Sequence, residues 1–360
     1  MRASSLRILY AVAAREKLKM RRWDFVAAYL QGSLEDGEFA YCQPPKGYST
    51  REVNGKVQMV PEGEGDGVRR VCRVEKPVYG MAQAGRRWQR ALFPWLLDWS
   101  DRKLQQSTAD TCIFHYQGTN STPNGPRTER LIVGCYVDDL FVLSSHDDEH
   151  SIYSSFVRDL SARWDVEDEG EVSDLLSIEI EPGDGHVALH QRKYVAKLMN
   201  TYAPDGPPKS HSRRLPPCDS SLVQHQSDSM LLDAADIDPA LVRKYQSLCG
   251  ALLYCAVNTR PDVAYAIGML CRSMARPTPE LYMYEDALRV LYYLHYTADL
   301  GLRYQADERD LSGMSDSDWA TRYSTTGWLF RSPTRKPRSL GARRNRCRSR
   351  CRRAKQRSLP

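Results

Sequence analysis

The pattern of apolar and polar positions changes its period several times along the first two hundred residues. Apolar residues at helical spacing predict helices over residues 3–19, 84–103, 147–163 and 191–202. Apolar or alternating stretches predict strands over residues 39–42, 68–74, 175–181 and 186–190, and two apolar runs within 131–143. Turn-forming composition predicts loops over residues 61–67 and 117–129. This mixture of helices and strands predicts an α+β fold.

Beyond residue 202 the pattern is interrupted and then becomes helical. Residues 203–238 are rich in Pro, Ser and Asp and are predicted to be a linker. Helical spacing follows over 239–257, 262–275 and 279–298, and strands at 300–304 and 311–315 open a new β region. The apolar pattern stops after Phe330. The chain is thus predicted to be α+β, divided into residues 1–202, 203–238, 239–299, 300–330 and a tail, 331–360.

The basic charge of the chain belongs to that tail. The whole chain carries 51 Lys and Arg against 45 Asp and Glu, a net charge of +6. Residues 331–360 hold thirteen of the basic side chains and no acidic one, so residues 1–330 carry 38 − 45 = −7. A basic body, the usual first sign of a nucleic-acid-binding protein, is therefore absent. Nucleic-acid binding has to be argued from local features.

The cysteines and the hydropathy of the chain indicate the kind of cellular compartment in which we expect the protein. The ten cysteines form no Cys-x-x-Cys pair, which favours free thiols in a reducing compartment over a disulfide framework. No apolar run approaches the roughly 18 residues that a membrane helix requires. We expect an intracellular protein of the cytoplasm or nucleus with no membrane partner. The sequence does not indicate an oligomeric state.

Two adjacent aspartates interrupt the most apolar stretch of the chain. Tyr136-Val137-Asp138-Asp139 stands between two apolar runs, a pattern that predicts a hairpin with the aspartates at its tip. Neighbouring side chains on a strand point to opposite faces, so both can serve one site only if the chain turns there. We therefore expect Asp138 to be the main ligand of a metal site and Asp139 the peripheral one. The simpler alternative is a polar turn.

Two further segments accompany this pair in order. The first, Trp23 to Gly32, carries Asp24 in an apolar stretch and an aromatic residue, Tyr29, five positions later. The second, Lys76 to Trp88, carries Gly80, where backbone or ligand could approach closely, and then a basic helix start. For Tyr29 the alternative is a core aromatic. The tryptophans that recur from Trp88 to Trp99 are predicted to be core.

Taken together, these segments resemble the reverse transcriptase of copia-type retrotransposons. That family shows D-V-x-x-A-F-L-x-G, then L-Y-G-L-K-Q-A-P-R-x-W, then Y-V-D-D, and all three patterns occur here in order. The resemblance covers roughly residues 3–330 and includes weaker matches, at Gln43 to Tyr48, Asp110 to Phe114, Leu175 to Ile180, Gln191 to Val195 and Tyr245 to Ala275.

The resemblance implies RNA-directed DNA synthesis with Mg²⁺ or Mn²⁺, dNTPs and an RNA or DNA template-primer. Asp24 and Asp138 would bridge two ions and Asp139 would support them, because nucleotidyl transfer uses two ions and hard cations prefer carboxylates. Tyr29 would lie beneath the sugar of the nucleotide and exclude a 2′-hydroxyl. The other implied positions are Gly80, Gln83 and Arg86 for nucleotide or template, and Leu176 and Ser177 for the primer grip.

The implied fold is a reverse-transcriptase palm with thumb-like helices and incomplete fingers, because most of the family's fingers region would precede residue 1. Some residues depart from the family's pattern. Ala82 and Gly85 stand where the family has Lys and Pro, Tyr29 where it has Phe, and Ser177 where it usually has Gly. The missing basic residues of the fingers would weaken the binding of dNTP.

A last resemblance concerns residues 300–330. Met314 to Ala320 and Ser324 to Phe330 resemble the opening of the copia-type ribonuclease H domain, with Asp316 at its first metal-binding aspartate. Because the tail that follows offers no Asp or Glu, we expect a truncated domain without ribonuclease H activity. The Arg-rich tail is interpreted as an out-of-frame product, with a nucleic-acid-binding arm as the alternative. Two other functions therefore stay open, an inactive remnant of a retroelement and RNA binding through the tail.

Overall fold

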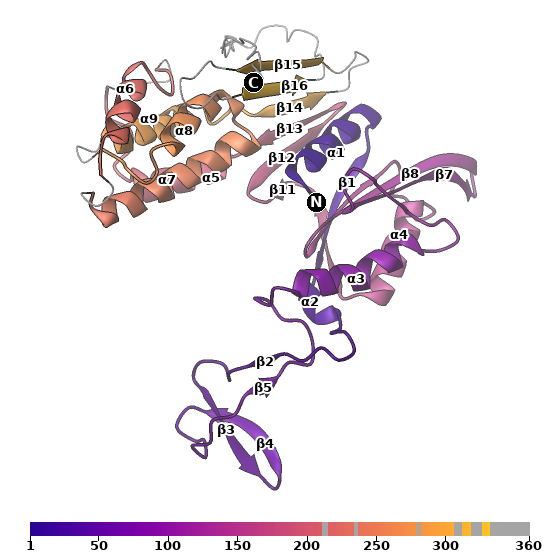
Figure 1. The fold of residues 1–360 in the computed structure, drawn as a ribbon. Coiled ribbons are helices and arrows are strands. Elements are labelled where there is room, and N and C mark those ends of the chain that lie inside the picture. Colours follow the sequence, from indigo (N-terminus) through magenta and orange to yellow (C-terminus); the bar gives the residue numbers. More distant parts are fainter. Residues whose placement is uncertain (211–214, 234–236, 279–281, 306–311, 318–325, 332–360) are drawn as a thin grey trace, which may run out of the picture. The chain divides into compact units, whose positions relative to one another are not determined.

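The structure, a computed structural model, describes residues 1–360 except 211–214, 234–236, 279–281, 306–311, 318–325 and 332–360 (Figure 1). Its internal contacts divide the chain into two units. The first contains Met1–Leu6 and Leu18–Val172, and the second contains Arg7–Lys17 and Ser173–Pro360. The N-terminal helix α1 (Ala3–Glu16), which the sequence predicted, contributes to both. The division thus falls at residue 172, before the boundary at 202 that the sequence indicated.

A six-stranded antiparallel sheet forms the centre of the first unit. Its strand order is β10-β1-β9-β8-β7-β6. The predicted hairpin is present as β8 and β9, and β1 pairs with β9 on one side and β10 on the other. The strands are β1 (Lys19–Phe25), β6 (Gln105–Gln106), β7 (Ile113–Thr122), β8 (Gly125–Tyr136), β9 (Asp139–Ser144) and β10 (Val166–Glu171).

Two helices pack their apolar faces against this sheet. Helix α3 (Ala84–Leu97) buries Trp88, Leu92 and Leu96, and α4 (Ile152–Arg163) buries its apolar residues in the same core. The tryptophans at helical spacing are thus core residues, as predicted. Pro94 lies inside α3 without ending it, and the helix ends at Leu97 rather than near residue 103. A short helix, α2 (Ala28–Gln31), follows β1 and contacts α3.

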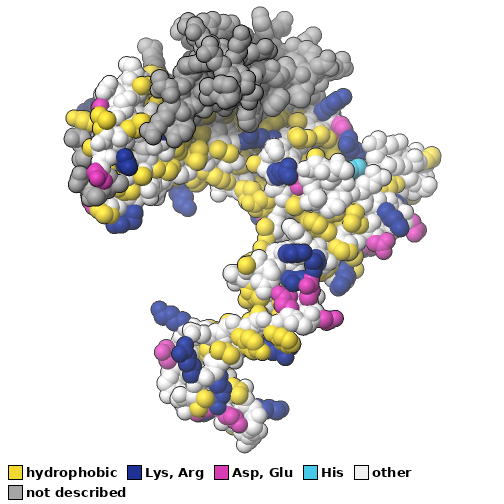
Figure 2. Space-filling model, in the orientation of Figure 1, with side chains coloured by type: hydrophobic (Ala, Val, Ile, Leu, Met, Phe, Trp, Pro, Cys, Tyr) yellow, Lys and Arg dark blue, Asp and Glu magenta, His cyan; other side chains and the backbone are white. Residues whose placement is uncertain are grey.

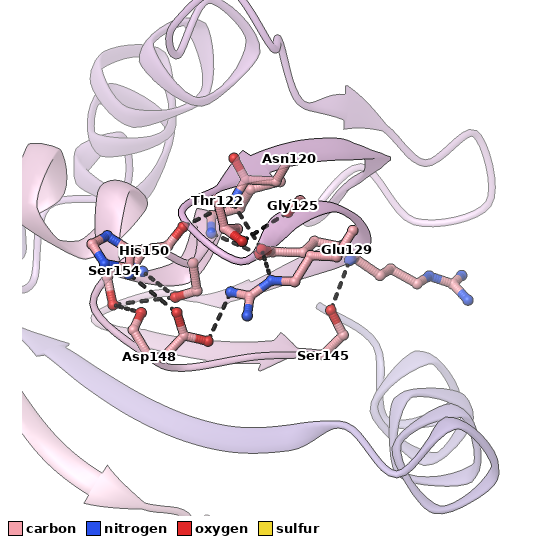
Figure 3. Close-up of polar contacts among 12 residues, drawn as sticks. Asn120, Thr122, Gly125, Glu129, Ser145, Asp148, His150 and Ser154 are labelled. Atoms are coloured by element: carbon pink, nitrogen blue, oxygen red, sulfur yellow. Dashed lines mark hydrogen bonds and ion pairs between the residues drawn. The ribbon is translucent and has the colours of Figure 1, made fainter.

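The predicted loop over residues 117–129 is wrong, because β7 and β8 continue through it as a two-stranded ribbon. The strands pair from Ile113 and Gly134 out to Thr122 and Gly125. The buried carboxylate of Glu129 holds the ribbon to the start of α4 (Figure 3). It accepts hydrogen bonds from Asn120 Nδ2 at 2.8 Å, from Arg127 Nε at 2.6 Å and from the backbone N–H of Ile152 at 2.8 Å.

An arm of short strands connects α2 to α3. Its inner pair is β2 (Tyr41–Cys42) with β5 (Cys72–Arg73), and its outer hairpin is β3 (Tyr48–Val53) with β4 (Lys56–Pro61). The strands predicted at 39–42 and 68–74 are thus reduced to two residues each. Large apolar side chains of the arm are exposed, among them Phe39, Tyr41, Val57 and Val71, and Figure 2 shows one face of this surface.

The second unit combines a helical core with a four-stranded antiparallel sheet in the order β11-β12-β13-β14. The predicted helices and strands are present here. The strands are β11 (Asp174–Leu175), β12 (Ile178–Gly183), β13 (His186–His190) and β14 (Leu302–Gln305). The helices are α5 (Arg192–Tyr202), α6 (Ser221–Met230), α7 (Pro239–Asn258), the 3-10 turn Pro261–Val263, α8 (Ala264–Cys271) and α9 (Tyr282–Tyr296).

The segment 203–238 is more than a linker, since it contains α6. Leu222 on this helix is buried in one core with residues of α5, α7, α8 and α9. The helix is favoured here because burial of the Leu222 side chain in this core lowers the free energy of the folded chain. The composition of the segment does not reveal that burial. Across the described residues no helix is both long and apolar enough to span a membrane.

Strands β15 (Ser312–Ser317) and β16 (Thr326–Arg331) pair with each other near the end of the chain. Asp316 lies on β15 opposite Gly327. The structure gives no description of its side chain. The Arg-rich tail from residue 332 also lies outside the described residues, so its assignment and that of Asp316 remain predictions.

Candidate active site

The sheet brings the three predicted aspartates together from distant parts of the sequence. In the pairing of β1 with β9, Asp24 lies directly opposite Asp139. The backbone N–H of Phe25 donates a hydrogen bond of 2.9 Å to the carbonyl oxygen of Asp138. Directly opposed residues share one face of an antiparallel pair, so Asp24 and Asp139 point to the same side.

The turn between β8 and β9 is tight and strained. Tyr136 pairs with Asp139, so the connection consists of Val137 and Asp138 alone. Val137 has a φ of 56°, in the left-handed region that β-branched residues avoid. Its carbonyl oxygen accepts a hydrogen bond of 2.9 Å from Trp88 Nε1 of α3. The core helix thus holds the turn in this conformation.

The carboxylates of the turn have different partners. Asp139 Oδ1 accepts a hydrogen bond of 2.8 Å from Arg22 Nε, two residues before Asp24 on β1. Asp138 Oδ2 accepts one of 2.8 Å from the hydroxyl of Tyr79. Asp138 Oδ1 is buried and has no hydrogen-bond partner among the described residues. A buried oxygen without a partner is uncommon and requires an explanation.

The electrostatics agree with a crowded set of negative charges. Burial raises the pKa of Asp24, and the nearby charges of Asp139 and Asp138 raise it further, against the opposing effect of Arg22. Burial and the hydrogen bond to Asp138 raise the pKa of Tyr79 to about 12, so its hydroxyl stays protonated as a donor. Like charges held this close favour an added proton or cation.

A divalent cation suits this donor set in chemistry, because hard cations prefer carboxylate oxygens. The unpartnered Oδ1 of Asp138 and the raised pKa of Asp24 fit such an ion. Nevertheless, the described residues include no group of three or more His, Cys, Asp or Glu side chains arranged to hold a metal ion. The Asp139 carboxylate is instead paired with Arg22. Any cation would thus be held first by Asp24 and Asp138.

Two tyrosines pack against each other beside Asp138. Tyr29 on α2 is half-buried at the edge of the core, and its ring lies 4.5 Å from that of Tyr79, with 32° between the planes. Sequence reasoning singled out Tyr29 but passed over Tyr79, although it stands within the second quoted segment. Its position directly before Gly80 gave no chemical signal, and only the folded chain shows its contact with Asp138.

The other predicted residues of the second segment surround the start of α3. Gly80 has a φ of 96°, which explains the glycine because side chains rarely adopt that conformation. Gln83 Nε2 donates a hydrogen bond of 3.0 Å to Glu38 Oε1, and Arg86 is exposed. Glu38 also forms an ion pair of 2.9 Å with Arg87, and Glu35 pairs with Arg87 and Arg90. Acidic residues of the arm thus neutralise much of this basic helix start.

The predicted primer-grip residues lie in the second unit, at the turn between β11 and β12. Leu176 and Ser177 both have positive φ, 54° and 58°. The hydroxyl of Tyr254 on α7 donates a hydrogen bond to the carbonyl oxygen of Leu176. A left-handed residue at position 177 explains why glycine suits this turn, and Ser177 occupies it at a conformational cost.

Comparison with known proteins places the chain in a family. A family model described as "Reverse transcriptase (RNA-dependent DNA polymerase)" matches residues 1–204, and the chain belongs to this family. Among its relatives are retrovirus-related Pol polyproteins of copia-type transposons. It is 26% identical to that of transposon TNT 1-94 from Nicotiana tabacum and 27% identical to that of transposon RE1 from Arabidopsis thaliana. The resemblance of the motifs to the reverse transcriptase of copia-type retrotransposons is confirmed, whereas that of residues 300–330 to a ribonuclease H opening stays a prediction.

These matches cover 91% of the chain but only 22% and 20% of the two polyproteins. The chain therefore spans about a fifth of their length. A shorter match, 41% identical, covers 24% of the chain and 63% of the secreted RxLR effector protein 161 of Plasmopara viticola. No solved structure matches the chain.

Proposed function

We propose that this chain is the polymerase part of a copia-type Pol polyprotein and catalyses RNA-directed DNA synthesis. The supporting observation is the convergence of Asp24 with Asp138 and Asp139 on adjacent strands, with one buried carboxylate oxygen lacking a partner. In this proposal the six-stranded sheet is the palm, the arm from residue 32 to 83 belongs to the fingers, and the helices of the second unit are thumb-like.

The contacts of the aspartates support a role for each. Asp24 and Asp138 would hold Mg²⁺ or Mn²⁺, and Asp139 would join them on leaving Arg22. When bound, two such ions supply charge stabilisation at the attacking and leaving oxygens of nucleotidyl transfer. The protein would contribute rigidity, because Asp24 is fixed by the strand pairing and Asp138 by the turn that Trp88 and Phe25 anchor.

The surrounding residues would recognise nucleotide and nucleic acid. Tyr29 would face the sugar and exclude a 2′-hydroxyl. Gly80, Gln83 and Arg86 would contact nucleotide or template, after release of the contact between Gln83 and Glu38. Leu176 and Ser177 would contact the primer. An RNA-binding role for the tail and a ribonuclease H-like segment at Asp316 remain predictions, and the domain boundaries at 202, 238 and 299 are part of this proposal.

Primer extension tests the proposal. Purified protein is given an RNA template with a DNA primer, dNTPs, and Mg²⁺ or Mn²⁺. We expect extension by the wild type and a loss of at least about a hundredfold in Asp24→Asn and Asp138→Asn, because a missing metal ligand removes several kcal/mol of charge stabilisation. Asp101→Asn, which changes an exposed carboxylate, is the matched control. A folded wild type that never extends a primer would support the inactive remnant instead.

A further inference from the structure

The hydroxyl of Tyr79 contacts a carboxylate of the candidate active site. Tyr79 lies in the segment between β5 and α3, and its hydroxyl donates a hydrogen bond of 2.8 Å to Asp138 Oδ2. The ring of the same residue packs on Tyr29 at a centroid distance of 4.5 Å. One side chain therefore touches both the proposed metal ligand and the proposed sugar-facing aromatic.

The two oxygens of Asp138 differ in their surroundings. Oδ2 is held by Tyr79, whereas Oδ1 is buried and has no hydrogen-bond partner among the described residues. A carboxylate bound through one oxygen to a cation commonly has its other oxygen held by a hydrogen-bond donor from the protein. The two oxygens of Asp138 show this division.

The backbone of Asp138 has little freedom of its own. Its carbonyl oxygen accepts from the N–H of Phe25, and the preceding carbonyl oxygen, of Val137, accepts from Trp88. Rotation of the side chain is then the main remaining freedom of the carboxylate. The contact with Tyr79 restricts that rotation.

We propose that Tyr79 is a positioning residue that orients Asp138 for cation binding through its hydroxyl, and that its ring supports Tyr29. This inference rests on the proposed function, since it assigns a cation to Asp138. The hydroxyl and the ring of Tyr79 then have separate roles, which substitutions can test one at a time. The hydroxyl governs the metal affinity of the site, and the ring governs the packing of the sugar-facing wall.

Direct measurement of Mn²⁺ binding tests the hydroxyl. Free Mn²⁺ is titrated by electron paramagnetic resonance in the absence of nucleotide and nucleic acid, so the readout does not depend on activity. We expect Tyr79→Phe to weaken Mn²⁺ binding about tenfold, the lower end of the effect of removing a residue that orients a metal ligand. Tyr48→Phe, which removes the hydroxyl of an exposed tyrosine on β3, should bind as the wild type does.

The variant should remain folded, because Tyr79 is 53% exposed and the phenylalanine keeps the ring contact with Tyr29. An unchanged urea midpoint would establish this. Wild-type protein that binds no Mn²⁺, or binding that survives Asp138→Asn, would overturn the proposed function itself. Binding lost in Asp138→Asn but unchanged or tightened in Tyr79→Phe would overturn only the role of Tyr79.

Discussion

Two partly or fully buried carboxylates, Glu129 within strand β8 and Asp138 just after it, differ in how their oxygens are hydrogen-bonded. In the first half of β8, Glu129 is buried and accepts hydrogen bonds from Asn120, Arg127 and the backbone of Ile152 (Figure 3). In the turn just past the end of β8, Asp138 has a buried oxygen without a hydrogen-bond partner among the described residues. Buried polar groups in folded proteins are usually hydrogen-bonded. The unpartnered oxygen of Asp138 therefore costs stability, which suggests that this residue serves a purpose other than stability.

The turns before and after β8 also differ, in their backbone strain. The connection from β7 to β8 places Gly125 at a φ of 105°, where glycine is without strain. The connection from β8 to β9 places Val137 at a φ of 56°, where a β-branched residue is strained. The comparison teaches that one strand can be relaxed at the end that fastens it to α4 and strained at the end that presents the aspartates.

The pKa values of the acidic groups follow this contrast. Although burial raises the pKa of Glu129, the hydrogen bonds from Asn120, Ile152 and Arg127 together hold it below its ordinary value. For Asp24, burial and then Asp139 raise the pKa. The ionised form is therefore stabilised by folding at Glu129 and destabilised by folding at Asp24.

The largest expected effect is at the relaxed end. Glu129→Gln should lower the free energy of unfolding by about 3 kcal/mol, because Arg127 loses its buried partner and the new amide N–H₂ opposes existing donors. Urea unfolding at pH 7 measures the loss, with the exposed Glu149→Gln as control. In the wild type, the contribution of Glu129 should be present above its unfolded pKa of about 4.3 and lost as the pH falls through its lowered folded value. A loss under about 1 kcal/mol would remove the contrast between the two ends.

An intermediate effect is expected from exchanging the turn residues. Val137→Gly should raise the free energy of unfolding by about 1 kcal/mol, because relief of the left-handed strain exceeds the entropy that glycine adds to the unfolded chain. Gly125→Val should lower it by about 1–2 kcal/mol for the converse reason. Thermal or urea unfolding of the two variants side by side measures both signs. If Val137→Gly destabilised the protein, the turn would not be strained.

The smallest effect is expected at Asp24. Without divalent ions, Asp24→Asn should raise the free energy of unfolding at pH 7 by roughly 0.5 kcal/mol, the size of partly exposed charge interactions. A raised folded pKa means that stability is present below the unfolded pKa of about 3.9 and lost as the pH rises through the folded value. The difference between variant and wild type should therefore shrink as the pH falls toward 4. Stability curves from pH 4 to 7 test this, and a difference that grew in acid would contradict the raised pKa.

Much of the fold was predictable because its signals are local. The apolar faces of α3, α4 and α7 and the paired runs around Asp138 and Asp139 appear directly in the sequence. The ribbon of β7 and β8 was missed because its outer part is half exposed on both faces and rich in turn-forming residues, such as Gly118 and Asn124. Helix α6 was missed because Leu222 is its one buried apolar residue, while its other buried residues, Gln226 and Ser229, are polar.

The candidate site was predictable in its residues but not in its contacts. The motifs named Asp24, Asp138 and Asp139, and the fold brings them together. The partners that give each carboxylate its character come from elsewhere in the chain. Tyr79 lies 59 positions before Asp138, and Arg22 lies 117 positions before Asp139. No local pattern carries such pairings, because they depend on which strands and loops become neighbours.

The place of β1 between β9 and β10 has a consequence for the order of folding. The hairpin of β8 and β9 can form from neighbouring residues, whereas β1 must wait for partners more than a hundred positions later. During synthesis, therefore, Asp24 emerges early and has no strand to join until residue 139 has been made. The arm between them adds little to the free energy of bringing β1 and β9 together, since doubling a flexible loop costs only about 0.6 kcal/mol of closure entropy. Pairings of such long sequence separation form slowly, and the aspartates are accordingly gathered late, after the scaffold around them has begun to fold.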